Sequence, residues 1–107
     1  MQNSRLEQLL SFLKEDPNDP FLLYAIAIEY EKSNQLDKVK EYFSFLLQHH
    51  EDYLATYYTA GKFYESIENK DLAIEVFTKG LQKAKQQNNF KTASEIQNAL
   101  NELLFDE

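Results

Sequence analysis

Residues 55–65 read ATYYTAGKFYE, the pattern of a helix with a glycine in its middle. Tyr57, Ala60, Gly61 and Tyr64 follow one another at intervals of three or four residues, so they share one face of that helix. A glycine inside a helix costs about 1 kcal/mol relative to alanine. Because packed helices approach most closely where a small residue lies between them, Gly61 predicts that a neighbouring helix crosses here.

The same pattern occurs once more, 34 residues earlier in the chain. Ala27 takes the place of Gly61, and a tyrosine follows each of these small residues at the same distance. The identical pairs in this register are Tyr24 and Tyr58, Tyr30 and Tyr64, Glu31 and Glu65, Asp37 and Asp71, Glu41 and Glu75, Phe43 and Phe77, Leu47 and Leu81, and Gln48 and Gln82. The coherence of these pairs indicates an internal structural repeat.

Each repeat reads as two helices. The first repeat predicts helices over 20–33 and 36–49, with Asp19 and Pro20 as the starting signal and Asn34 as the break between them. In the second repeat, a turn at 68–70 separates the apolar positions of residues 57–64 from those of residues 72–81. We expect buried tyrosines at Tyr30, Tyr57 and Tyr64, because they stand on the apolar faces.

One further helix is expected on each flank. Residues 4–15 have the spaced apolar positions of a helix that ends at Asp16-Pro17, and they correspond to the second helix of a repeat whose first helix is missing. Residues 89–105 form a long amphipathic pattern, typical of a helix that caps the exposed apolar face of a terminal repeat. The sequence therefore predicts an all-α chain of about six helices.

This arrangement resembles the tetratricopeptide repeat family, which has a 34-residue unit of two antiparallel helices. The positions that carry the resemblance are Leu23, Ile26, Ala27, Tyr30, Val39, Phe43 and Leu46, and then Tyr57, Ala60, Gly61, Tyr64, Ala73, Phe77 and Gly80. The proline that closes a unit is replaced by Glu51 and Lys85. The resemblance implies a single superhelical domain over 1–107, with an N-terminal helix in 1–17, repeats in 20–53 and 54–87, and a capping helix in 88–107.

Composition narrows the classes of function. There is no cysteine among the 107 residues, and no apolar run is long enough to span a membrane. The net charge of −7 disfavours nucleic acid as a partner, because phosphates would be repelled. We expect a cytoplasmic protein that binds neither membrane nor nucleic acid.

The residues that could carry chemistry are few. The sequence contains no phosphate-binding loop and no nucleophile or metalloprotease motif. His49 and His50 are adjacent, so on a helix they point about 100° apart and suit the end of the helix better than a shared metal ion. The carboxylates, for example those of Glu29, Glu41 and Glu75, are expected on solvent-exposed faces. We therefore predict no enzyme activity, no metal and no cofactor.

The resemblance also implies a binding surface, because the first helix of each unit lines a concave groove in this family. We call the residues that the family's repeat register places in this groove the groove stripes. They are Phe21, Tyr24, Ile28, Glu31 and Lys32 in the first repeat, and Tyr58, Thr59, Lys62, Glu65 and Ser66 in the second. The lysine-asparagine-arginine clamp that grips chaperone tails is absent, because Tyr24, Ile28 and Thr59 stand in its places and Lys62 is the one cation. The alternative to an open groove is that one of the terminal helices folds over these stripes and covers them.

The function predicted from these observations is protein–protein interaction, with a peptide or a partner helix held in the aromatic groove. Self-association into a homodimer is an alternative, either through the same groove or through Leu103, Leu104 and Phe105. A weaker alternative is the docking of a basic protein on the N-terminal half. Residues 1–53 carry 5 basic and 10 acidic residues, a balance of −5.

Overall fold

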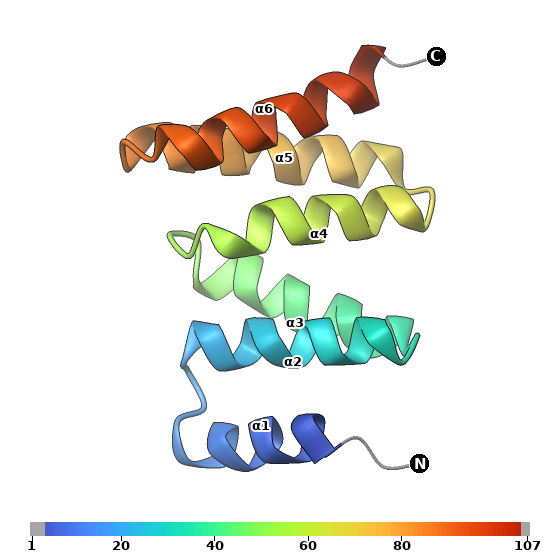
Figure 1. Cartoon of the computed structure of the whole chain (residues 1–107), viewed down its shortest axis with the longest axis vertical. Coiled ribbons are helices and arrows are strands. Elements are labelled where there is room, and N and C mark those ends of the chain that lie inside the picture. Colours follow the sequence, from blue (N-terminus) through green and yellow to red (C-terminus); the bar gives the residue numbers. More distant parts are fainter. Residues whose placement is uncertain (1–3, 106–107) are drawn as a thin grey trace. The chain divides into compact units, whose positions relative to one another are not determined.

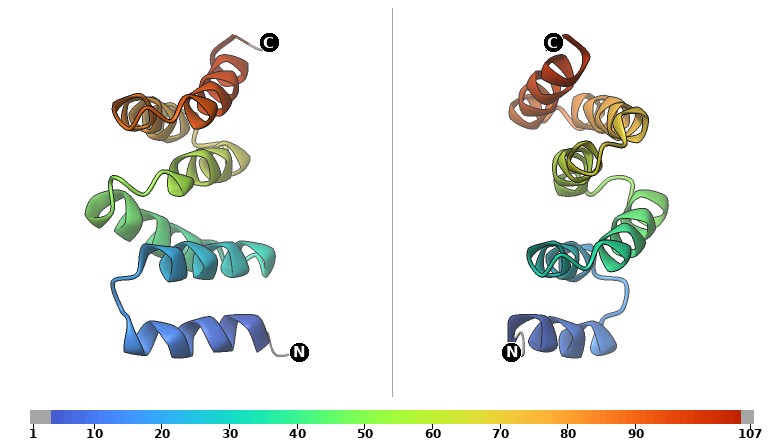
Figure 2. Two further views of the ribbon diagram at one scale, coloured as in Figure 1. Left: turned by 60° about the vertical axis from the view of Figure 1, so that its left-hand side comes forward. Right: turned by 90° about the vertical axis from the view of Figure 1, so that its right-hand side faces the viewer.

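The computed structural model describes residues 4–105, and within this range the chain forms six α-helices and no strand (Figure 1). The helices are α1 (Ser4–Glu15), α2 (Pro20–Lys32), α3 (Leu36–His49), α4 (Ala55–Ser66), α5 (Lys70–Gln86) and α6 (Phe90–Phe105). They form two compact units, Met1–Tyr53 and Leu54–Glu107. Within each unit, every helix runs antiparallel to the one before it (Figure 2). The all-α prediction is confirmed.

Three turns share one backbone conformation. Asn34, Glu68 and Asn88 have positive φ angles of 59°, 64° and 59°, the left-handed conformation that ends a helix. After each of them, a backbone N–H donates to the carbonyl five residues earlier: Gln35 to Tyr30 at 3.0 Å, Asn69 to Tyr64 at 2.9 Å and Asn89 to Ala84 at 2.9 Å. The left-handed residues 34 and 68 repeat with the 34-residue period of the sequence.

Side-chain caps fix the beginnings of α2, α5 and α6. Asp19 accepts a hydrogen bond from the N–H of Phe21 at 2.9 Å, and Pro20 is the first helical residue, as the sequence predicted. Asn69 and Asn89 accept from N–H groups three residues on, at 3.2 Å and 3.1 Å. Each cap satisfies a donor that has no partner inside its helix.

The first unit packs α2 against both α1 and α3. Its fully buried apolar residues come from α2 and α3, and they are Ile26, Ala27, Val39, Phe43 and Leu46. Tyr30 is buried as predicted. Leu9 is the one buried residue of α1. Since α1 has fewer buried apolar residues than the other helices, its polar contacts to α2 contribute a larger share of what holds it in place.

The second unit explains its two glycines. A Cβ atom on Gly61 would meet the ring of Phe77, only 2.6 Å from its Cζ atom. A Cβ on Gly80 would collide with the Cβ of Tyr57 and lie 2.7 Å from its Cγ atom. Tyr57 and Phe77 are both fully buried. Each helix of the α4–α5 pair therefore places a glycine beneath an aromatic residue of the other, which confirms the close crossing predicted from the sequence.

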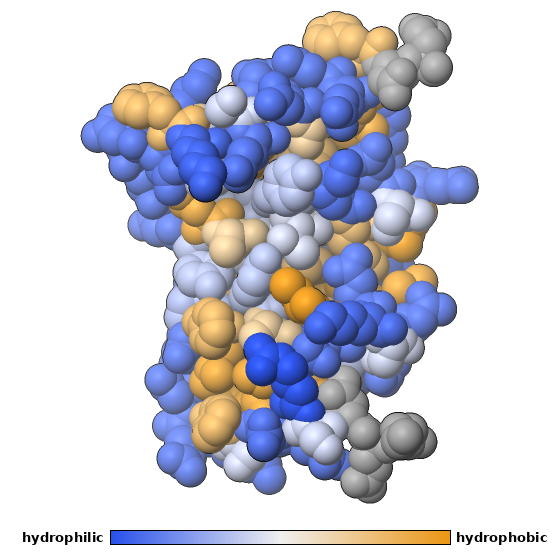
Figure 3. Space-filling model, in the orientation of Figure 1, coloured by the Kyte–Doolittle hydropathy of each residue, from blue (hydrophilic) through white to orange (hydrophobic). Residues whose placement is uncertain are grey.

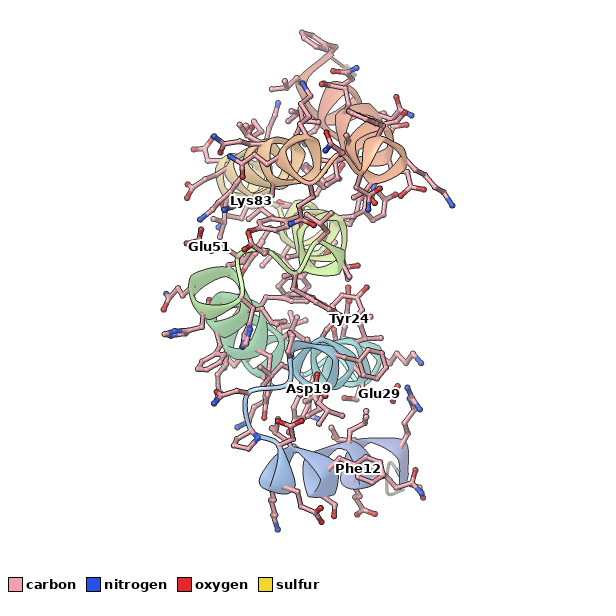
Figure 4. All side chains as sticks on the ribbon, turned by 90° about the vertical axis from the view of Figure 1, so that its left-hand side faces the viewer. Phe12, Asp19, Tyr24, Glu29, Glu51 and Lys83 are labelled. Carbon is pink, nitrogen blue, oxygen red and sulfur yellow. The ribbon has the colours of Figure 1, made fainter. Side chains whose placement is uncertain are left out.

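One carboxylate contradicts the expectation of a solvent-exposed position. Glu29 is only 5% exposed, and its Oε2 atom forms an ion pair with Arg5 Nε at 3.2 Å and accepts a hydrogen bond from Lys32 Nζ at 3.3 Å. Figure 4 shows Glu29 extending from α2 on the side of α1. The prediction failed because Arg5 lies on a different helix, and that helix supplies a cation that makes burial of the carboxylate tolerable.

Candidate protein-interaction surface

The groove stripe of the first unit lies on α2 and is partly exposed. The Phe21 side chain is 55% exposed, while Tyr24 and Ile28 are half-buried. The ring of Tyr24 meets the ring of Tyr53 edge-on, with centroids 5.9 Å apart. Lys32 is exposed but already pairs with Glu29. Phe21 is therefore the most accessible aromatic anchor of this stripe, and Tyr24 is partly a packing residue.

The first unit has another exposed aromatic ring, Phe12, which lies outside the groove stripe expected from the 34-residue register. Phe12 of α1 is 57% exposed, and its helix ends close to where α2 begins. Apolar surface gathers over this part of the first unit (Figure 3). Phe12 is one of the spaced apolar positions of residues 4–15, and it is accessible because α1 is incompletely covered.

The groove stripe of the second unit lies on α4. The Tyr58 side chain is 42% exposed, and its ring centroid is 6.4 Å from that of Phe77. Thr59 is half-buried. Lys62 Nζ pairs with Glu65 Oε1 at 3.5 Å, one turn along the same helix. The cation of this stripe is thus already matched by a charge beside it.

A hollow of about 370 Å³ opens beside Tyr58 in the second unit. It is lined by Tyr58 of α4 and by four residues of α6: Glu95, Asn98, Ala99 and Glu102. Among the residues described, neither Glu95 nor Glu102 has a cationic partner. The 34-residue register does not reach these α6 residues, because α6 belongs to neither repeat. The spacing of 95, 98 and 102 along one helical face was the available signal.

Burial raises the pKa of three groups of the first unit, Glu31, Tyr42 and Tyr53; of these, Glu31 belongs to the groove stripe and Tyr53 contacts it through Tyr24. The pKa of Glu31 is raised above its ordinary value because burial penalises its charged form. The pKa of the Tyr53 hydroxyl is also raised, mainly by burial and further by Tyr24 and Asp19 nearby. Glu31 and Tyr53 thus lie in partly dehydrated surroundings on a surface that is otherwise solvent-exposed.

The histidines close a helix, as the sequence predicted. His49 is the last residue of α3, and the N–H of His50 donates to the carbonyl of Leu46 at 2.8 Å. Across residues 4–105, no three side chains of metal-ligating type come together. None of the helices in the same range is both long and apolar enough to cross a membrane.

Comparison with solved structures identifies the fold. A solution NMR structure of a tetratricopeptide repeat domain protein from Salinibacter ruber is 34% identical, with a TM-score of 0.81 over 85% of this chain and 92% of that one. A crystal structure of a tetratricopeptide repeat domain protein from the same organism is 34% identical, with a TM-score of 0.78 over 83% of this chain and 100% of that one.

The sequence matches no family model, and no curated protein matches it. The fold of these solved relatives is in general a scaffold for protein–protein interaction and not for catalysis. With this identity and coverage, together with two repeats of helical hairpins in the same register, the chain belongs to the tetratricopeptide repeat family.

Proposed function

We propose that this protein is a non-enzymatic interaction module that binds a peptide or a partner helix through the groove stripes of α2 and α4. Family membership supports protein interaction as the general role. A cytoplasmic location, no cofactor, and a partner that is neither nucleic acid nor membrane remain sequence-based predictions.

The exposure of Phe21 and Tyr58 carries the proposal. Both side chains lie on first helices whose other faces are filled by the cores of their units. An exposed aromatic ring on an otherwise well-packed helix contributes affinity when a partner covers it, and aromatic residues dominate such hot spots. The cations of the stripes are already paired, so they suit the rim of a binding surface better than its anchor.

The test is selection from a random-peptide display library followed by measurement of the selected peptides on variants. Phe21→Ala and Tyr58→Ala should each weaken binding about tenfold, the usual range for an aromatic anchor, while melting and helicity change little. Phe90→Ala is the matched control, because Phe90 is exposed on α6 outside both stripes. Unchanged binding in both stripe variants, or loss in the control, contradicts the proposal.

Self-association is the second candidate, and the exposed end of α6 favours it. Leu104 is exposed, and Phe105 is 74% exposed at the end of the same helix. Sedimentation of the whole chain distinguishes the two functions. A dimer that Leu104→Ser/Phe105→Ser converts to a monomer supports self-association, and a monomer at all concentrations refutes it.

A further inference from the structure

The hollow beside Tyr58 combines an aromatic ring with two carboxylates from another helix. Tyr58 extends from α4, and Glu95, Asn98 and Glu102 follow one face of α6. Of the groove-stripe charges in this unit, Lys62 and Glu65 neutralise each other. Glu95 and Glu102 have no such neutraliser among the residues described. The hollow is therefore an aromatic pocket with an uncompensated negative charge.

This chemistry selects a particular kind of side chain. A guanidinium group stacks on the face of a tyrosine ring and also bonds carboxylates through its planar set of donors. Asn98 adds a side-chain carbonyl that accepts from an N–H donor. An acidic ligand would instead meet two like charges in the lining of the hollow, which is unfavourable.

The spacing on α6 adds a second requirement. Glu95 and Glu102 are seven residues apart, which separates them by roughly 10 Å along the helix axis. In a peptide of the polyproline II type, residues three positions apart lie on the same side and are separated by about 9 Å. Two cationic residues at that interval would therefore reach both carboxylates together.

We propose that the hollow formed by Tyr58, Glu95, Asn98 and Glu102 binds a basic peptide segment, with arginine residues three positions apart. This inference rests on the proposed function and names the chemical class of its partner. Arginine at one position stacks on Tyr58, and arginine at the other pairs with the more distant carboxylate. The charges are the reverse of those in the lysine-asparagine-arginine clamp, because here the protein supplies the carboxylates and the peptide supplies the cations.

The experiment uses the full isotope-labelled chain and a blocked Arg-Ala-Ala-Arg peptide as the probe, with binding followed by NMR chemical shifts. Amide signals of α6 around Glu95 to Glu102 and the ring of Tyr58 should shift and saturate. The same peptide with citrulline in place of arginine keeps the shape but has no charge, and it should produce no saturable shift. Added salt should weaken the binding of the arginine peptide.

Variants assign the binding to the hollow. Glu95→Gln and Glu102→Gln should each weaken binding about two- to fivefold, the range of an exposed ion pair, and the double variant about tenfold. Tyr58→Leu keeps an apolar side chain but removes the ring face, and it should weaken binding as well. Glu75→Gln is the matched control, because Glu75 is exposed on α5 away from the hollow.

The outcomes separate this inference from the proposed function. Saturable shifts whose binding the two glutamine variants weaken, and Glu75→Gln does not, support the basic-peptide site. Equal shifts with citrulline, or shifts outside the hollow, overturn it. If library peptides bind the groove stripes but lack cationic residues, the inference fails and the interaction function stands. If arginine peptides bind the hollow while Phe21→Ala leaves every library peptide unaffected, the two-stripe function fails instead.

Discussion

Gly80→Ala should destabilise the protein, although alanine is the better helix former. The added Cβ would collide with the Cβ of Tyr57 and lie 2.7 Å from its Cγ and 3.1 Å from Ile96 Cδ1. Carbon atoms pack at roughly 3.5–4.0 Å, so the required displacement is about 1 Å. Tyr57 cannot turn away, because the colliding atom is attached to the backbone and the side chain is fully buried. The helices α4 and α5 must therefore separate.

The expected magnitude follows from two opposing terms. Overpacking a filled core costs about 1–3 kcal/mol, and we take the upper end because backbone, not a side-chain tip, has to move. Helix propensity returns about 1 kcal/mol. The net loss in the free energy of unfolding is thus about 2 kcal/mol, which lowers Tm by roughly 8 °C in a chain of this size.

Chemical denaturation followed by circular dichroism measures the change. Gln82→Ala and Gln82→Gly provide the control, because Gln82 is exposed on the same helix and the difference between these variants isolates the propensity term. Subtracting that term from the Gly80→Ala result leaves the steric penalty. If Gly80→Ala is as stable as the natural chain, or more stable, then the glycine is a tolerated defect and the close-crossing argument is wrong.

Three further changes test other parts of the structure. Glu68→Asn should raise the free energy of unfolding by about 0.5–1 kcal/mol in a urea titration, because Glu68 has a positive φ of 64° that asparagine tolerates better; a loss would contradict this. Glu29→Gln should lower the free energy of unfolding by about 1–2 kcal/mol, because it weakens a buried ion pair. Glu41→Gln, in an exposed ion pair, is the control and should change this free energy little. Equal effects of the two substitutions would show that the buried pair of Glu29 is not important for stability. The folded-state pKa of Tyr53 is raised, so its contribution to stability is present below about pH 10 and is lost as pH rises further. Urea titrations at alkaline pH should show a shallower decline for Tyr53→Phe, and an unchanged slope would contradict the assignment.

The fold could be predicted from the sequence because the same local signals occur twice. A left-handed residue follows α2 at Asn34 and α4 at Glu68, which sets the period independently of the side chains in the core. The expected helices 20–33 and 36–49 match Pro20–Lys32 and Leu36–His49 to within one residue. The length of α5 was harder to predict, since Ala84 is buried beyond the last apolar position recognised in the sequence. No equivalent position in the first repeat reveals this extension.

The candidate surface could be predicted only in part, because exposure depends on which helix covers which face. The 34-residue register correctly placed Tyr30, Tyr57 and Tyr64 in the core. It could not show that Glu29 is buried, since this requires knowing that Arg5 of another helix lies against it. Nor could it find Glu95 and Glu102, because α6 is not a copy of either repeat.

The residues that build the fold and those that would choose a partner are therefore separate sets on the same helix. On α4, Tyr57 and Gly61 are fixed by their contacts with Gly80 and Phe77, so almost any change there disturbs the hairpin. Tyr58 is the next residue along, yet it projects into the hollow beside α6 and has no comparable constraint. If the proposed sites bind a partner, substitutions at such positions should alter recognition at little cost in stability. Family membership consequently specifies the scaffold, whereas the identity of the partner has to be inferred from the exposed residues of this chain.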